Sequence, residues 1–175
     1  MHKSRLQTPS PNEGYKVSSF SEFNIGSHAS CISYNPSTRT IVVSCGSSAK
    51  LTDIYNKLHD SSVLARQFPI GTWFLSANLV ISKGASFHID STDTKWLKIN
   101  SKVDRSGGPK ITAPAYIIDV FGSLKIDSVK ITSWDPTTNY YAKSNGSRTG
   151  SGLFIFGAPR PSIVVEDNAT GTRYH

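Results

Sequence analysis

Charged side chains are scarce in this sequence and make up only 18 % of its 175 residues. Apolar residues, at 37 %, are also below the ~45–50 % that is usual in globular chains. Serine, threonine, asparagine and glycine are abundant instead, and such residues favour solvent-facing strands and tight turns over helices. Aromatic residues, at 10 %, are too frequent for a disordered chain. The composition therefore predicts one folded, strand-rich domain.

Long apolar runs are absent, so the sequence predicts no membrane-spanning helix. Residues 1–6 lack the apolar core of a signal peptide, so an exported protein would have lost its true start or would use an unusual route. The histidines stand apart from one another and from the cysteines, which predicts no metal site. We expect no cofactor, and no motif supports a calcium site.

The balance of charge is basic, with a formal net charge of +7 and an isoelectric point near 9.5. A basic chain favours anionic partners, which include nucleic acids, acidic lipids and acidic glycans. The lysines and arginines are scattered singly, and no nucleic-acid-binding motif is present. An acidic glycan therefore remains as one interpretation, and a basic protein without a charge-driven ligand is the other.

The two cysteines, Cys31 and Cys45, flank a predicted hairpin whose turn region is 35–38. A loop centred on Thr38 would place them opposite each other, within reach of a disulfide. The alternative is two free thiols that are buried as small apolar side chains. A disulfide would indicate an oxidising compartment.

One segment predicts a helix, because Leu51, Ile54, Tyr55 and Leu58 recur at the spacing of one helical face. Thr52 or Ser48 could cap its start. A short helix before a run of strands is suited to covering the open end of a β-structure. We therefore divide the chain into three parts: a polar leader or loose cap at 1–28, a cap of hairpin and helix at 29–70, and stacked strands at 71–175.

Two segments in the C-terminal part resemble each other. Residues 85–91 and 123–128 both alternate apolar with polar residues, both end in Ile-Asp-Ser and both follow a glycine. Within the two segments, Phe87 matches Leu124 and Ile89 matches Ile126. A strand is predicted before each segment, at 79–81 and 116–118, and another after each segment, at 96–99 and 129–132. A third copy begins at 162–166 and would reach the start of its second strand at 172–175.

Three short strands per repeat are typical of a parallel β-helix. The sequence thus predicts an all-β fold of about two to three coils, with an N-terminal hairpin and a short capping helix. Two to three coils bury little apolar surface. The open C-terminal end would therefore need further coils or a partner to cover it. An antiparallel sandwich, which also has short alternating strands, is the competing architecture.

Several stretches carry a resemblance to right-handed parallel β-helix proteins of the pectin-lyase-like superfamily, and within it to mannuronan (alginate) C-5-epimerase-like proteins. The stretches are Gly71-Thr72-Trp73-Phe74-Leu75, Asn78-Leu79-Val80-Ile81, Gly84-Ala85, Ile89-Asp90-Ser91, Trp96-Leu97-Lys98-Ile99, Gly122-Ser123-Leu124, Ile126-Asp127-Ser128, Thr132-Ser133-Trp134-Asp135 and Pro159-Arg160-Pro161-Ser162. The resemblance implies an extracellular or cell-surface protein associated with a polysaccharide. It carries over no catalytic residue, because the family's Asp-Pro-His-Asp motif is absent and Asp135-Pro136-Thr137 has no histidine.

Candidate binding residues follow from side chains predicted to face outward or to lie on loops. Aromatic rings stack on sugars, cations bind uronate carboxylates, and an outward carboxylate on the strand 116–121 could contact sugar or calcium. The candidates are Trp134, Tyr140 and Tyr141 among aromatic residues, Arg105, Lys110, Lys143, Arg148 and Arg160 near two loops, His88 and Lys125 beside Asp90 and Asp127, and Asp119. For each, core packing or a solvated surface is the alternative.

Three functions remain open. The first is a non-catalytic module that presents loops to an anionic polysaccharide. The second is part of an epimerase or polysaccharide lyase whose catalytic coils are missing. The third is an adhesin or structural β-solenoid without sugar chemistry.

Overall fold

The computed structural model describes residues 30–101, 116–142, 161–166 and 173–174. These residues form mostly strands, with one short helix, α1 (Leu51–Leu58). Sheet A contains β1 (Ile32–Asn35), β2 (Thr40–Val43), β5 (Asn78–Ile81), β8 (Ile117–Val120) and β12 (Ser162–Val165). Sheet B contains β6 (Ser86–Asp90), β9 (Ser123–Asp127) and β13 (Arg173–Tyr174). Sheet C contains β3 (Leu64–Gln67), β4 (Thr72–Leu75), β7 (Trp96–Asn100), β10 (Lys130–Asp135) and β11 (Tyr140–Tyr141).

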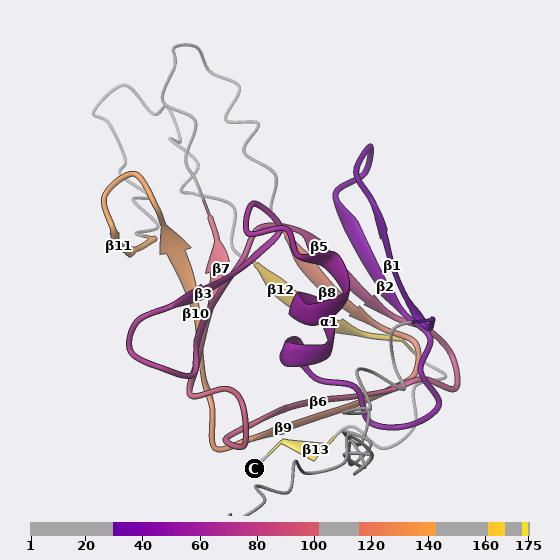
Figure 1. The fold of residues 1–175 in the computed structure, drawn as a ribbon. Coiled ribbons are helices and arrows are strands. Elements are labelled where there is room, and N and C mark those ends of the chain that lie inside the picture. Colours follow the sequence, from indigo (N-terminus) through magenta and orange to yellow (C-terminus); the bar gives the residue numbers. More distant parts are fainter. Residues whose placement is uncertain (1–29, 102–115, 143–160, 167–172, 175) are drawn as a thin grey trace, which may run out of the picture.

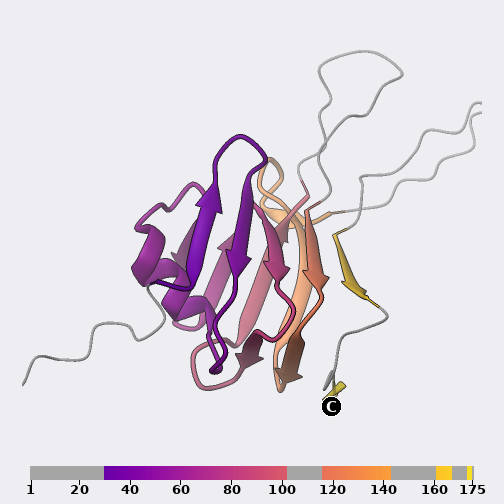
Figure 2. The ribbon, with the colours of Figure 1, turned by 90° about the vertical axis from the view of Figure 1, so that its right-hand side faces the viewer.

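The chain visits the three sheets in turn, and each strand lies beside the equivalent strand of the next turn (Figures 1 and 2). One turn is β5, β6 and β7, the next is β8, β9 and β10, and β12 and β13 continue sheets A and B. The two Ile-Asp-Ser segments pair in parallel, with Ile89 opposite Ile126 and Asp90 opposite Asp127. Parallel pairing in this register confirms the predicted repeat, and it contradicts an antiparallel sandwich.

An earlier turn precedes the two that the sequence predicts. β2 pairs in parallel with β5, Ala49 bridges to Phe87 in sheet B, and β4 pairs in parallel with β7. The predicted hairpin strand at Thr40 is therefore also the first strand of the stack. The repeat is obscured here because sheet B receives a single residue, and because α1 and β3 are inserted before β4.

Apolar side chains on the inner faces stack in register and form the core. One ladder in sheet A joins Ile41, Leu79 and Ile118, each of which is fully buried. Another in sheet B joins Ala49 and Phe87 to Leu124. Helix α1 lies at the N-terminal end of the three sheets (Figures 1 and 2), where Leu51 and Ile54 are completely buried. The predicted covering helix is thus confirmed.

The start of α1 is fixed differently from the prediction, because neither Thr52 nor Ser48 caps it. The Lys50 N–H donates to the Asp53 carboxylate at 2.8 Å. The Thr52 N–H and hydroxyl donate to Asp93 Oδ2 at 3.0 and 2.9 Å. Asp93 follows β6, so a carboxylate from the next turn satisfies a donor that a local cap would otherwise serve. Such a long-range partner leaves no local sequence pattern.

The hairpin of β1 and β2 carries the Cys31–Cys45 disulfide, with a Cα–Cα distance of 5.0 Å. The register pairs Ile32 with Val43 and Asn35 with Thr40, so the turn is centred between Ser37 and Thr38 rather than on Thr38. Cys31 accordingly faces Ser44, whose N–H donates to its carbonyl oxygen at 2.8 Å. The disulfide joins a diagonal pair just beyond the ladder, and the prediction of directly opposed cysteines is wrong by one residue.

Sheet C has an antiparallel strand at each edge. β3 pairs with β4, and β11 pairs with β10 through Trp134–Tyr141 and Asp135–Tyr140. The sequence predicted no strand between 129–132 and 162–166, but the chain returns to the sheet at Tyr140 and Tyr141. β10 also extends to Asp135, so Trp134 lies in a strand and not beside it.

Candidate functional site

The outer face of sheet C gathers aromatic rings and lysines. We call it the aromatic–lysine face, and it consists of Trp96, Lys98, Lys130, Trp134 and Tyr141, with Tyr140 in ring contact with Tyr141 at its edge. Side chains alternate across a strand, so Trp96 and Lys98 point outward while Leu97 and Ile99 enter the core. The parallel register places Lys130 beside Trp96 on the neighbouring strand.

The rings of this face contact one another edge to face. Trp96 and Trp134 have ring centroids 5.2 Å apart, and Trp134 and Tyr141 are 5.4 Å apart. Tyr140 follows at 5.1 Å from Tyr141 and is 53 % exposed. The Trp96 indole N–H donates to the Thr132 hydroxyl at 2.8 Å. These contacts fix the rings, so a ligand would meet a preorganised surface.

Lys98 is held among the rings. Its Nζ lies 3.9 Å from the Trp134 centroid and 4.3 Å from that of Trp96, and it donates to Gln67 Oε1 at 3.1 Å. Only 7 % of Lys98 is exposed. Burial lowers the pKa of Lys98, because it disfavours the charged form; the Lys130 charge lowers it further and Tyr141 opposes the shift.

Lys130 lies at the rim of the same cluster. Its Nζ is 4.4 Å from the Trp96 centroid, and it donates to the Tyr141 hydroxyl. In the part of the chain that the structure describes, the ion pairs involve Lys50, His88 and Asp90, and neither Lys98 nor Lys130. Lys130, which has an aromatic wall and no carboxylate partner there, could bind a carboxylate on a ring-shaped ligand, while the buried Lys98 would add positive charge beneath the rings.

The structure brings together three of the predicted residues, namely Trp134, Tyr140 and Tyr141. Trp134 is only 7 % exposed and covers Lys98, whereas Tyr140 offers an open ring. The predicted loop cations lie outside the described residues; they are Arg105, Lys110, Lys143, Arg148 and Arg160.

His88 and Lys125 pair across sheet B, as predicted, but they do not form a free ladder of cations. His88 Nδ1 lies 3.8 Å from Asp90 Oδ2, and Ser48 Oγ lies 3.2 Å from His88 Nε2. Asp90 also lies 3.4 Å from Lys50 Nζ. Burial would raise the pKa of Asp90, but hydrogen bonds from Thr92 and the Lys50 charge outweigh it and lower the pKa. This network joins the first turn to the second.

Asp119 lies on β8 in sheet A, away from the aromatic–lysine face. It pairs with Val80 on one side and Val164 on the other, and its Oδ1 is buried without a hydrogen-bond partner among the described residues. Across the same described part of the chain, no three His, Cys, Asp or Glu side chains gather where they could hold a metal ion. Nothing there links Asp119 to calcium.

Sequence reasoning missed Trp96, Lys98 and Lys130 as site residues. The sequence predicted Trp96 and Lys98 only as parts of the strand 96–99, and Lys130 only as part of the strand 129–132. The missing signal was the alternation of Trp96-Leu97-Lys98-Ile99 with Lys130-Ile131-Thr132, which places both lysines on one outer face once the two strands are paired.

No known family model matches this sequence, and neither does any curated protein. Among solved structures, the chain is similar to the periplasmic alginate epimerase AlgG, at 17 % identity and a TM-score of 0.51. A single-site mutant of that enzyme gives 18 % identity and a TM-score of 0.52. Each alignment covers 74 % of this chain and 25 % of the other, so the chain spans about a quarter of these structures. At this identity the likeness shows the fold alone. No helix among the described residues is long and apolar enough to cross a membrane.

Proposed function

We propose that this chain is part of a right-handed parallel β-helix that binds an anionic polysaccharide on the aromatic–lysine face. The turns of β5–β6–β7 and β8–β9–β10, stacked in parallel, support the architecture, as does the fold likeness to an alginate epimerase. On this proposal β1, α1 and β3 form the cap, and the coils begin with β2, Ala49 and β4.

The observation that carries the proposal is the pair of lysines within the aromatic cluster. Lys98 and Lys130 each lie against Trp96, and the ion pairs of the described residues include neither of them. Sugar rings have apolar faces that stack on aromatic side chains, and uronates carry the carboxylate that an ammonium group binds. A polyuronate provides both features in each repeating unit.

We expect a protein with this function to lie outside the cytoplasm. The Cys31–Cys45 disulfide is typical of oxidising compartments. The structural neighbour is described as periplasmic, which supports the same expectation. The net charge of +7 also favours association with an anionic matrix.

A titration calorimetry experiment tests the proposal with hexamers of mannuronate, and with cellohexaose as the neutral comparison. We expect the uronate hexamer to bind, with an affinity that falls as salt is added, and cellohexaose to bind weakly. Lys130→Gln should weaken uronate binding about three- to tenfold, since an exposed charge contributes about 1 kcal/mol.

Lys125→Gln is the matched control, because Lys125 is an exposed outward lysine on the preceding strand, β9. It should leave binding unchanged. Lys98→Met should reduce binding while the free energy of unfolding stays the same or rises, because methionine fills a similar space without a buried charge. Equal effects of Lys125→Gln and Lys130→Gln would contradict a site on sheet C.

A second candidate is the charge clamp of an epimerase or lyase. Removal of the proton at C5 of a uronate requires cations beside the carboxylate, and Lys98 and Lys130 are such cations. The fold likeness to an alginate epimerase favours this reading. Exchange of the C5 hydrogen of polymannuronate in D2O, followed by NMR, separates catalysis from binding alone.

A further inference from the structure

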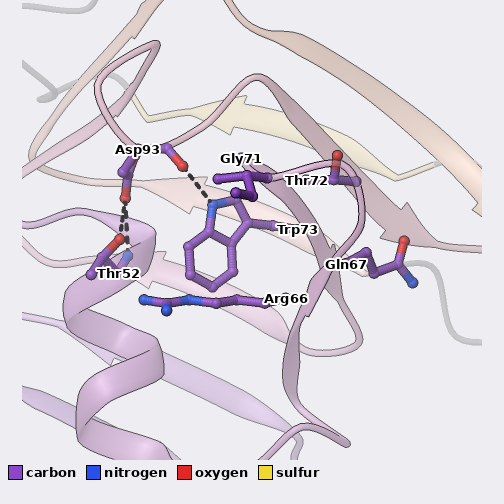
Figure 3. Close-up of a pocket in the computed structure, with 8 residues that line it drawn as sticks. Thr52, Arg66, Gln67, Gly71, Thr72, Trp73 and Asp93 are labelled. Atoms are coloured by element: carbon purple, nitrogen blue, oxygen red, sulfur yellow. Dashed lines mark hydrogen bonds between the residues drawn. The ribbon is translucent and has the colours of Figure 1, made fainter.

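A pocket of about 410 Å³ lies at the N-terminal end of the stack, apart from the aromatic–lysine face. Its lining includes Thr52 of α1, Arg66 and Gln67 of β3, Trp73 of β4, and Asp93 (Figure 3). The volume is within the range of about 300–1,000 Å³ that is usual for small-molecule sites. One sugar ring would fit in such a space.

Arg66 is the cation of this pocket. Its guanidinium lies 4.4 Å from the Tyr55 centroid and 5.1 Å from that of Trp73, and Figure 3 shows the side chain running beneath the Trp73 ring toward α1. No ion pair of the described residues includes Arg66. Rings on its faces leave the edges of the guanidinium, where the N–H donors lie, available for a carboxylate.

Asp93 provides acceptors in the same pocket. Its Oδ2 accepts the two hydrogen bonds from Thr52, and its carbonyl oxygen accepts the Trp73 indole N–H at 3.0 Å. These bonds fix the carboxylate, and it is not within ion-pair distance of Arg66. A ligand with a carboxylate and nearby hydroxyl groups could therefore contact both residues at once.

Gln67 connects the pocket to the aromatic–lysine face. It lines the pocket, and its Oε1 accepts the hydrogen bond from Lys98 Nζ at 3.1 Å. β3 is the edge strand of sheet C, so the pocket lies where that sheet ends. By the strand register, Gln67 and Thr72 lie on the same side of sheet C as Trp96, whereas Arg66 and Trp73 lie on the opposite side with Leu97. A polymer on the aromatic–lysine face would therefore reach the pocket by passing Gln67 and turning around the edge strand β3.

We propose that this pocket is a terminal subsite, in which Arg66 binds the carboxylate of the last uronate of a chain and Asp93 accepts hydrogen bonds from its hydroxyl groups. The inference rests on the proposed function, since the aromatic–lysine face holds the remainder of the polymer. It adds recognition of a chain end to recognition of an anionic polymer.

The three tryptophans allow the two regions to be observed separately by NMR, because each indole N–H gives its own resonance. Trp73 reports on the pocket, and Trp96 and Trp134 report on the aromatic–lysine face. Methyl glucuronide should shift the Trp73 resonance in a saturable manner, whereas methyl glucoside should not. Mannuronate hexamer should shift all three.

Arg66→Lys keeps the charge but loses the fork of donors, and it should weaken methyl glucuronide binding about tenfold. Lys57→Gln, which removes an exposed charge from the same helix that lines the pocket, should leave it unchanged. A hexamer that shifts Trp96 and Trp134 but not Trp73 would overturn the terminal subsite alone. A hexamer that shifts none of the three would overturn the proposed function and the subsite together.

Discussion

Asp90 shows how one residue holds two turns of this molecule together. It lies at the end of β6 and accepts hydrogen bonds from Thr92 and from Lys50, which precedes α1. Its side chain is 13 % exposed, so these donors replace most of its water. The contact therefore fixes the covering helix to the sheet below it.

Asp90→Asn should lower the free energy of unfolding by about 1–2 kcal/mol at pH 7, because it loses charge-assisted hydrogen bonds. The folded state lowers the pKa of Asp90, so the stabilisation is present above the ordinary pKa of about 3.9 and is lost as the pH falls through the folded value. Denaturant unfolding at pH 7 and pH 3 should show the variant and wild type converging at the lower pH.

Asp127→Asn is the control, since Asp127 occupies the paired position in the next turn without a described ion pair. At pH 7, Asp127→Asn should lower the free energy of unfolding by less than Asp90→Asn does. A constant difference between Asp90→Asn and wild type at both pH values would contradict the electrostatic explanation.

At the scale of residues, the sequence identified Trp134, Tyr140 and Tyr141 as aromatic candidates but not the cations beside them. The covering of Lys98 depends on Trp134 and Gln67, which are brought to it only by strand pairing. Arg66 was missed for the same reason, because its two aromatic partners come from α1 and β4.

The turn before each sheet B strand shows that equivalent glycines can serve different needs. Gly84 has φ +78°, a conformation that side chains disfavour, and open space around it. Gly122 has no such φ, but a Cβ there would lie 2.4 Å from the Ser82 carbonyl oxygen and 2.5 Å from that of Ala85. The repeated glycine thus reflects torsion in one turn and close stacking in the next.

Gly122→Ala should destabilise the fold by about 1–3 kcal/mol, because the backbone of two adjacent turns must separate to admit the methyl group. Thermal or denaturant unfolding measures the loss. Gly46→Ala is the control, since Gly46 is exposed and nothing lies within 4 Å of a Cβ there. Equal stability of the two variants would refute the close-contact argument.

At the scale of elements, the sequence predicted α1, the first hairpin and the repeated strands, all of which carry a local period. It missed β3 and β11, which are four and two residues long. Such short antiparallel strands form because a neighbouring strand offers an edge, and not because of their own pattern. The earliest turn was missed because Ala49 alone represents sheet B there.

For the whole molecule, the disulfide secures the strand that covers the first edge of sheet A. Among the described strands, β1 pairs only with β2, whereas β2 also pairs with the stack through β5. The double variant Cys31→Ser with Cys45→Ser should therefore lose about 3 kcal/mol of stability, which is the value expected for a closed loop of this length. It should retain the stacked turns.

Denaturant unfolding of the variant, and of the wild type with reductant, should give matching curves. Far-ultraviolet circular dichroism should still show the strand content of the folded protein. An unchanged free energy of unfolding in the double variant would show that β1 does not need the covalent link.

Sheet C differs from its neighbours in having a hairpin strand at both margins, β3 and β11. Sheets A and B are extended by β12 and β13, but β10 is followed by the antiparallel β11. Among the described residues, sheet C therefore carries an antiparallel strand at each margin, and on the proposed function a bound polysaccharide would lie across the strands between β3 and β11.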